Sequence, residues 1–129
     1  MKFLKNLFHS DSINERENGF DWIDLHSSDQ LEVLNDTSYH HSQLIFKHST
    51  SCGISGMVKR SFQTQSDLPE EGISYYLLDL LRYRDISNAI AEKYNVRHES
   101  PQVLVIRNGE VVAHGSHHNV SALNPADWV

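Results

Sequence analysis

The strongest constraint on the fold is a pair of short apolar runs, one on each side of a segment with helical spacing of its apolar residues. Gln43–Lys47 and Ile73–Leu80 are short and apolar, as strands covered on both faces are. Between them Ile54, Val58 and Phe62 recur at helical spacing, which predicts a helix. Two strands joined by a helix favour a right-handed βαβ unit.

The segment before this unit predicts one more strand and one more helix. The apolar residues of Phe20–Leu25 indicate a short strand. Ser27 followed by Gln30 is a capping box, so a helix begins there. We expect residues 1–19 to be a flexible or short-helical leader and residues 20–129 to form one domain.

The segment after the unit predicts a helix and a hairpin. Asp85–Tyr94 has one apolar face, and Asn95 suits the left-handed position that ends a helix. Asn108-Gly109 between two apolar runs is typical of a two-residue hairpin. Pro125 limits any last helix to a short stub. The predicted hairpin strands are Gln102–Ile106 and Glu110–Ala113.

Composition narrows the functional classes. The 129 residues carry a net charge of −6, which argues against general nucleic-acid binding, because phosphate neutralisation needs a basic surface. The sequence has no long apolar stretch, so we expect neither a signal peptide nor a membrane span. A single cysteine cannot form an internal disulfide, which indicates a reducing cytoplasm.

That cysteine, Cys52, lies between a predicted strand and the helix that follows it. A thiol at a helix N-terminus faces unpaired backbone donors and the positive end of the helix dipole, which lower a thiol pKa from about 8.5 into the range of roughly 3.5 to 7.5. Ser55 stands where a second cysteine would complete a CxxC pair. Its hydroxyl can donate to sulfur but cannot resolve a mixed disulfide, so an external thiol must complete the reaction.

Two alternatives stay open at this site. A single cysteine is often a small buried side chain, although serine, threonine and glycine neighbours favour a reactive one here. Ser100-Pro101 comes just before a predicted strand. A cis bond there would expose the Ser100 backbone to an extended substrate, whereas a trans proline at a strand start is the other possibility.

With these residues in place, the chain resembles the monothiol bacilliredoxins of the thioredoxin-like superfamily over roughly Trp22 to Val120. The resemblance implies an α/β fold with a central mixed sheet of four to five strands and helices on both faces. It also implies a cis proline at 101. The matching stretches are Leu44-Ile45-Phe46-Lys47-His48-Ser49-Thr50, Cys52, Ile54-Ser55, Tyr83-Arg84, Ser87-Asn88 and Val96-Arg97-His98-Glu99-Ser100-Pro101-Gln102-Val103-Leu104.

The resemblance further implies that Cys52 takes bacillithiol from mixed disulfides on client proteins. Bacillithiol would be a co-substrate rather than a bound cofactor, no metal would be needed, and bacillithiol or a reductase would regenerate the cysteine. We expect a monomer. The candidate catalytic residues are Cys52 and Ser55, and the candidate substrate-binding residues are Lys47, Ser51, Gly53, Arg97, Ser100 and Pro101.

One departure from the family concerns the nucleophile's neighbour, because Gly53 stands where the family usually has proline.

Three rival interpretations of the function remain. Cys52-Gly53-Ile54-Ser55 also resembles the CGFS motif of monothiol glutaredoxins, which carry iron–sulfur clusters, although the Gly-Gly pair of those proteins is missing after the hairpin. A binding module with an idle cysteine is the second. The third interpretation is metal binding by the neighbouring histidines His114, His117 and His118.

Overall fold

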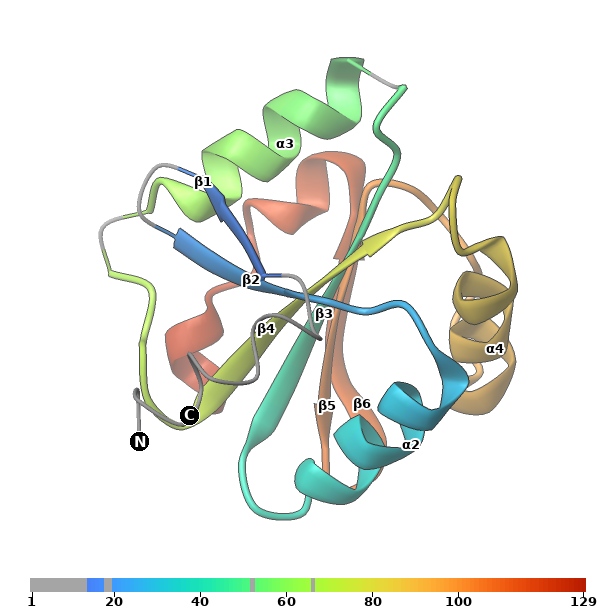
Figure 1. Ribbon diagram of the computed structural model, residues 1–129. Coiled ribbons are helices and arrows are strands. Elements are labelled where there is room, and N and C mark those ends of the chain that lie inside the picture. Colours follow the sequence, from blue (N-terminus) through green and yellow to red (C-terminus); the bar gives the residue numbers. More distant parts are fainter. Residues whose placement is uncertain (1–13, 18–19, 52, 66) are drawn as a thin grey trace.

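The computed structural model describes residues 14–17, 20–51, 53–65 and 67–129, in which one sheet carries helices on both faces (Figure 1). The strands are β1 (Asn14–Glu17), β2 (Phe20–Asp24), β3 (Ser42–His48), β4 (Ile73–Asp79), β5 (Gln102–Arg107) and β6 (Glu110–Ser116). The helices are α2 (Ser28–Thr37), α3 (Gly53–Gln63) and α4 (Arg84–Tyr94), followed by the 3-10 turns η1 (His117–Val120) and η2 (Pro125–Trp128).

The sheet is mixed and has the order β1-β2-β4-β3-β5-β6. Strand β4 pairs in parallel with β2 and with β3, whereas the other neighbours are antiparallel. The predicted α/β class is confirmed, but the sheet has six strands instead of four to five. The difference comes from Asn14–Glu17, which pairs antiparallel with β2 although it falls in the expected leader.

Local signals explain where the elements begin and end. The Ser27 hydroxyl accepts the Gln30 N–H at 3.1 Å, and the Gln30 side chain accepts the His26 N–H at 2.8 Å, which confirms the capping interaction. Asn95 ends α4 with φ 54°. Asn108 and Gly109 both have positive φ, as a type I′ hairpin turn requires.

Only short structure follows the hairpin, as Pro125 predicts. Turns η1 and η2 each have four residues, and η2 opens with Pro125. The Ser42 hydroxyl donates to the Trp128 carbonyl, which joins this tail to the start of β3. Within the described part of the chain, no helix is long and apolar enough to cross a membrane.

The two faces of the sheet have different cores. The α3 face is rich in aromatic rings, among them Trp22, Phe46 and Phe62. The face covered by α2 and α4 is mainly aliphatic (Figure 1). Every residue of β3 is buried, because this strand lies between β4 and β5 with helices on both sides. The last two residues of this buried strand are the polar pair Lys47 and His48.

Candidate functional site

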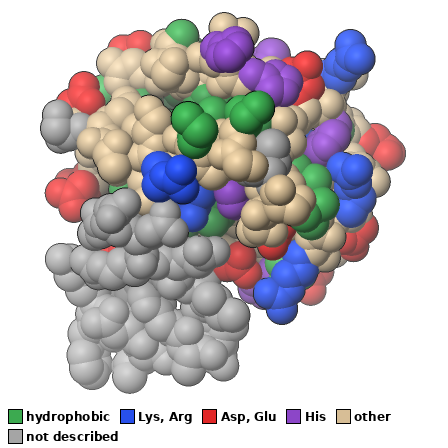
Figure 2. All heavy atoms as spheres, turned by 90° about the horizontal axis from the view of Figure 1, so that it is seen from above, with side chains coloured by type: hydrophobic (Ala, Val, Ile, Leu, Met, Phe, Trp, Pro, Cys, Tyr) green, Lys and Arg blue, Asp and Glu red, His purple; other side chains and the backbone are tan. Residues whose placement is uncertain are grey.

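The expected nucleophile follows β3 in the chain. Cys52 lies outside the described residues, but Ser51 and Gly53 on either side of it are described and exposed. Helix α3 begins at Gly53, and its first turn contains no acidic residue. A Cβ at Gly53 would meet no atom within 4 Å, so space does not require glycine there. The face around α3 is open to solvent, and exposed hydrophobic side chains lie on it (Figure 2).

Ser55 lies in the first turn of α3 with a fully buried side chain. Its hydroxyl oxygen accepts the Ser49 N–H at 3.1 Å and lies 3.0 Å from Nδ1 of His48. We call His48, Ser49 and Ser55 the His48 cluster. When His48 Nδ1 carries a proton, the Ser55 oxygen accepts both contacts and its O–H is available to another acceptor. When Nδ1 is bare, the Ser55 proton is donated to the ring.

The loop before β5 approaches the end of β3. The Ser100–Pro101 peptide bond is cis, as the resemblance implies. Pro101 is buried, and Gln102 directly after it pairs with Lys47 in the sheet. Among the described residues, the Ser100 backbone has no hydrogen-bond partner, and its buried hydroxyl has none either. The Ser100 backbone is therefore open to pairing with an extended segment.

Lys47 does not lie where a substrate-binding residue was expected. Its side chain is fully buried, and Nζ donates to the Ser87 carbonyl at 3.1 Å. Nζ also lies 3.4 Å from Nδ1 of His98, which is 3.0 Å from the Ser87 hydroxyl. Burial, with a smaller contribution from Arg84, lowers the pKa of Lys47 to about 8. As placed here, Lys47 cannot reach a surface ligand, because β3 points its ammonium at α4.

Arg84 completes this group, since its guanidinium lies 3.1 Å from Nε2 of His98. We call Lys47, Arg84, Ser87 and His98 the Lys47 cluster. Burial first, and the nearby charges of Lys47 and Arg84 next, lower the pKa of His98. The cluster brings the end of β3, the first turns of α4 and the loop before Pro101 together.

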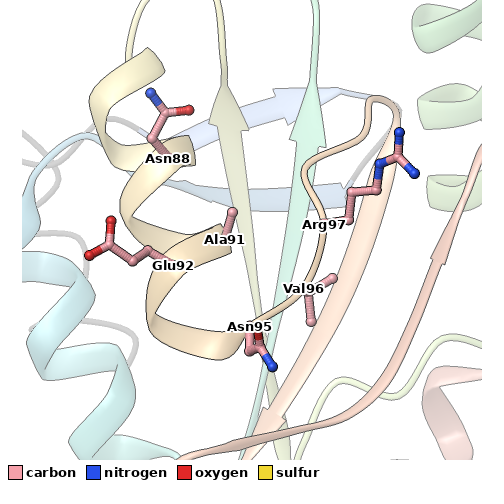
Figure 3. Close-up of a pocket in the computed structure, with 6 residues that line it drawn as sticks. All are labelled: Asn88, Ala91, Glu92, Asn95, Val96 and Arg97. Atoms are coloured by element: carbon pink, nitrogen blue, oxygen red, sulfur yellow. The ribbon is translucent and has the colours of Figure 1, made fainter.

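Arg97 is exposed, as expected of a residue that could bind an anion. It lines an open groove of about 540 Å³ between α4 and the following loop. Figure 3 shows its guanidinium directed away from Asn88 and Glu92, which line the opposite side of the groove. Its carbonyl accepts the Gln102 side-chain amide at 2.9 Å, so the backbone of Arg97 is attached to β5.

The histidines after the hairpin do not form a metal site in the part of the chain that the structure describes. No group of three or more potential metal ligands is found there. His114, His117 and His118 are all exposed. Their neighbour Glu99 accepts a hydrogen bond from the Ser116 hydroxyl, which lowers the pKa of Glu99, and the nearby His117 adds to this.

Sequence reasoning did not assign roles to His48, Arg84, Ser87 and His98. A signal was available for His48, because a polar pair at the end of a buried strand needs partners on both faces of the sheet. The other three are far from Lys47 in sequence. They occur in the stretches that carry the family resemblance, but nothing in their spacing indicates contact.

Comparison with known proteins agrees with this geometry. The family model described as monothiol bacilliredoxin BrxC matches residues 23–124. That range includes Cys52, both polar clusters and Pro101. Two of the unassigned histidines, His48 and His98, therefore lie inside the matched segment.

Solved structures with the same fold include a thioredoxin-fold protein with a provisional assignment as an oxidoreductase. It is 34% identical, with a TM-score of 0.63 over 80% of this chain and 86% of that one. The thioredoxin Mala s 13 of Malassezia sympodialis is 20% identical, with a TM-score of 0.62 over 77% of this chain and 81% of its own. Thioredoxin from Trypanosoma brucei brucei is 15% identical, with a TM-score of 0.62 over 84% and 90%. The last two show the thioredoxin fold alone.

Proposed function

The chain belongs to the monothiol bacilliredoxin family, with the thioredoxin fold and a monothiol redox function, and from this premise we propose that it removes bacillithiol from client proteins. The substrate is a mixed disulfide between bacillithiol and a client cysteine. Cys52 is the nucleophile. The client protein is returned with a free thiol.

The proposed step balances as a thiol–disulfide exchange. The Cys52 thiolate attacks the bacillithiol sulfur, a new disulfide forms, and the bond to the client sulfur breaks. The client leaves as a thiolate and takes a proton from water. A second thiol, either bacillithiol itself or one supplied by a reductase, then attacks the disulfide on Cys52 and restores it.

The observation that carries this proposal is the position of the chain's only cysteine directly before the first residue of α3. A helix N-terminus without acidic residues favours a thiolate. Ser55, three residues further on, has the hydroxyl that can donate to sulfur when the proton of His48 lies on Nδ1. The open Ser100 backbone is a candidate site for an extended client segment.

Intact-mass analysis tests the proposal. Wild type and Cys52→Ser are incubated with oxidised bacillithiol and, separately, with oxidised glutathione. We expect one bacillithiol adduct on wild type alone, formed faster than a glutathione adduct. A wild-type protein that accepts neither thiol would contradict the function, and equal rates would contradict the choice of bacillithiol.

The conditions of this cycle are part of the proposal. We propose that the protein works as a monomer in a reducing cytoplasm, with bacillithiolated proteins as partners and no tightly bound cofactor. Release of free thiol from a bacillithiolated client, measured with and without added bacillithiol, shows whether the small thiol alone completes the cycle.

A further inference from the structure

Three basic side chains meet beside the loop that carries Pro101. Arg84 lies 3.1 Å from Nε2 of His98, and Lys47 lies 3.4 Å from Nδ1 of the same ring. Figure 3 shows α4 beside the loop of Val96 and Arg97, which leads directly to His98. The two cations lie on either side of this ring, and the charge of Arg84 disfavours the charged form of Lys47.

The hydrogen bonds determine the protonation of His98. A guanidinium can only donate, so Nε2 must accept from Arg84. In the neutral ring the proton then lies on Nδ1 and is donated to the Ser87 hydroxyl. Lys47 therefore faces an N–H rather than an acceptor. His98 orients Arg84 and leaves four of its five donors for another partner.

No carboxylate of the described residues is paired with this group. Within the described residues, neither Lys47 nor Arg84 nor His98 forms a salt bridge. Glu99, the acid next to His98, accepts the Ser116 hydroxyl, and its charge is the smallest of the influences on the pKa of His98, which it raises. Among the residues that the structure describes, the buried ammonium of Lys47 has one oxygen partner, the Ser87 carbonyl, for its three donors. A buried positive charge with so few acceptors is costly, and a bound anion would lower that cost.

The backbone adds to the positive potential. Arg84 is the first residue of α4, and the N-cap residue Tyr83 makes no side-chain capping bond. The first amides of a helix are unpaired and favour anions. Asp85 in the same turn is exposed, without a bond to the cluster among the residues described.

This corner lies at the same end of the sheet as the nucleophile's neighbours. Lys47 precedes the last residue of β3, four residues before Ser51, and pairs with Gln102 directly after Pro101. To be bound here, a small disulfide that reaches Cys52 must extend from the end of β3 to the loop before Pro101 and the start of α4. A carboxylate is the common anionic group of bacillithiol and glutathione.

We propose that Arg84, oriented by His98 and backed by the buried charge of Lys47, binds a carboxylate of the small thiol whose disulfide reacts at Cys52. This inference rests on the proposed function. Arg84 makes the contact. His98 is a positioning residue, and Lys47 contributes charge from the interior.

Disulfide kinetics with charged and uncharged substrates test this assignment. Adduct formation on Cys52 is measured for wild type, Arg84→Gln and Arg107→Gln, with bacillithiol disulfide and with uncharged 2-hydroxyethyl disulfide. We expect Arg84→Gln to slow the reaction with bacillithiol disulfide by roughly tenfold, the effect of one charged hydrogen bond, and to leave the uncharged substrate unaffected. Arg107→Gln removes an exposed arginine at the far end of β5 and should change neither rate.

The outcomes separate the two hypotheses. Equal slowing of both substrates, or no slowing, overturns the carboxylate site while the proposed function stands. If wild type reacts with neither disulfide, the proposed function fails. In that case the carboxylate site is tested separately, by titrating the protein with malate, a small dicarboxylate, and following the NMR resonance of the Arg84 Nε–H. We expect a saturable shift in wild type that is weakened in His98→Leu, and its absence overturns the site.

Discussion

The His48 cluster and the Lys47 cluster lie at the end of the same strand but on opposite faces of the sheet. His48 contacts Ser55 of α3, whereas Lys47 contacts Ser87 of α4, and these helices cover opposite faces (Figure 1). The His48 cluster consists of a ring nitrogen, a hydroxyl and a backbone N–H that are close in sequence. The Lys47 cluster joins three separate segments and holds positive charge that is not paired with a carboxylate of the described residues.

The buried polar groups of the two clusters have different roles, one structural and one electrostatic. Ser55 fixes the connection between β3 and α3 through a backbone N–H and a ring nitrogen, which is what a precise local geometry requires. Lys47 is unfavourable where it lies, and burial lowers its pKa. A group that destabilises the free protein is better explained by what it does for a ligand than by stability.

Replacing Lys47 by methionine should give the largest effect on stability. The pKa of Lys47 is about 8 in the folded protein and about 10.5 in the unfolded chain. Between these values the unfolded state binds more protons, so wild-type stability rises with pH, and below pH 8 the full penalty of about 3 kcal/mol applies. Lys47→Met removes the penalty, so denaturant unfolding at pH 7 should show a more stable protein.

The pH dependence is the sharper part of this test. Between pH 8 and 9.5 the stability advantage of Lys47→Met over wild type should shrink by about 2 kcal/mol. Measurements stop there because burial raises the pKa of Tyr75, Tyr76 and Tyr94, and their titration lowers stability at higher pH. If the stability advantage of Lys47→Met over wild type did not change with pH, the Lys47 cluster would not contain a destabilising buried charge, and the proposed difference between the two clusters would be wrong.

Ser55→Ala should cost about 1.5 kcal/mol, because it removes the hydroxyl that contacts the partly buried Ser49 N–H and the buried His48 Nδ1. Since pH 8 and pH 9.5 both lie above the ordinary histidine pKa of about 6.5, the cost should be the same at the two values. Ser61→Ala, on the exposed side of the same helix, is the matched control and should change stability by less than about 0.5 kcal/mol. Equal effects of the two variants would show that the His48 cluster contributes nothing specific.

The fold was predictable from the sequence because its signals are local. The spacing of Ile54, Val58 and Phe62, the Ser27 capping box and the Asn108-Gly109 turn each act within a few residues. The strand at Asn14–Glu17 was missed, because polar residues have no apolar period and its pairing with β2 is a tertiary effect.

The site was predictable only in part, for the same reason. The position of Ser55 at the start of a helix was inferred from the chain, and the cis proline was implied by the resemblance. The structure has Ser55 in the first turn of α3 and a cis Ser100–Pro101 bond. Lys47 was expected to bind the substrate, although its place in an apolar run indicated burial. Its contact with His98, 51 residues away, depends on how the loop before β5 lies against α4. No local pattern encodes that arrangement.

Gly53→Pro tests whether the connection on the α3 side is already rigid. Gly53 is the first residue of α3 and a Cβ there meets open space, so proline fits a position where it is favoured. Restricting the unfolded chain should stabilise the protein by about 0.5 kcal/mol in denaturant unfolding. Destabilisation would show that the connection before α3 needs the conformational freedom of glycine. Gly53→Ala, which keeps the backbone N–H, is the matched comparison.

The smallest effect is expected at acidic pH on the α4 side. Burial, Lys47 and Arg84 lower the pKa of His98, so the unfolded chain binds a proton there before the folded protein does. Acid should therefore weaken the wild type as pH falls from about 6.5, the ordinary pKa of histidine, through the lower folded value. His98→Asn should lose part of this sensitivity, whereas His114→Asn, an exposed histidine on β6, should follow wild type in denaturant unfolding at pH 7 and pH 5. The effect is modest because His98 is half-buried and partly screened by water. If His98→Asn were as acid-sensitive as wild type, the acid sensitivity would not come from His98. The orientation of Arg84 by a neutral His98 ring would then be contradicted, and so would the electrostatic difference between the Lys47 cluster and the His48 cluster.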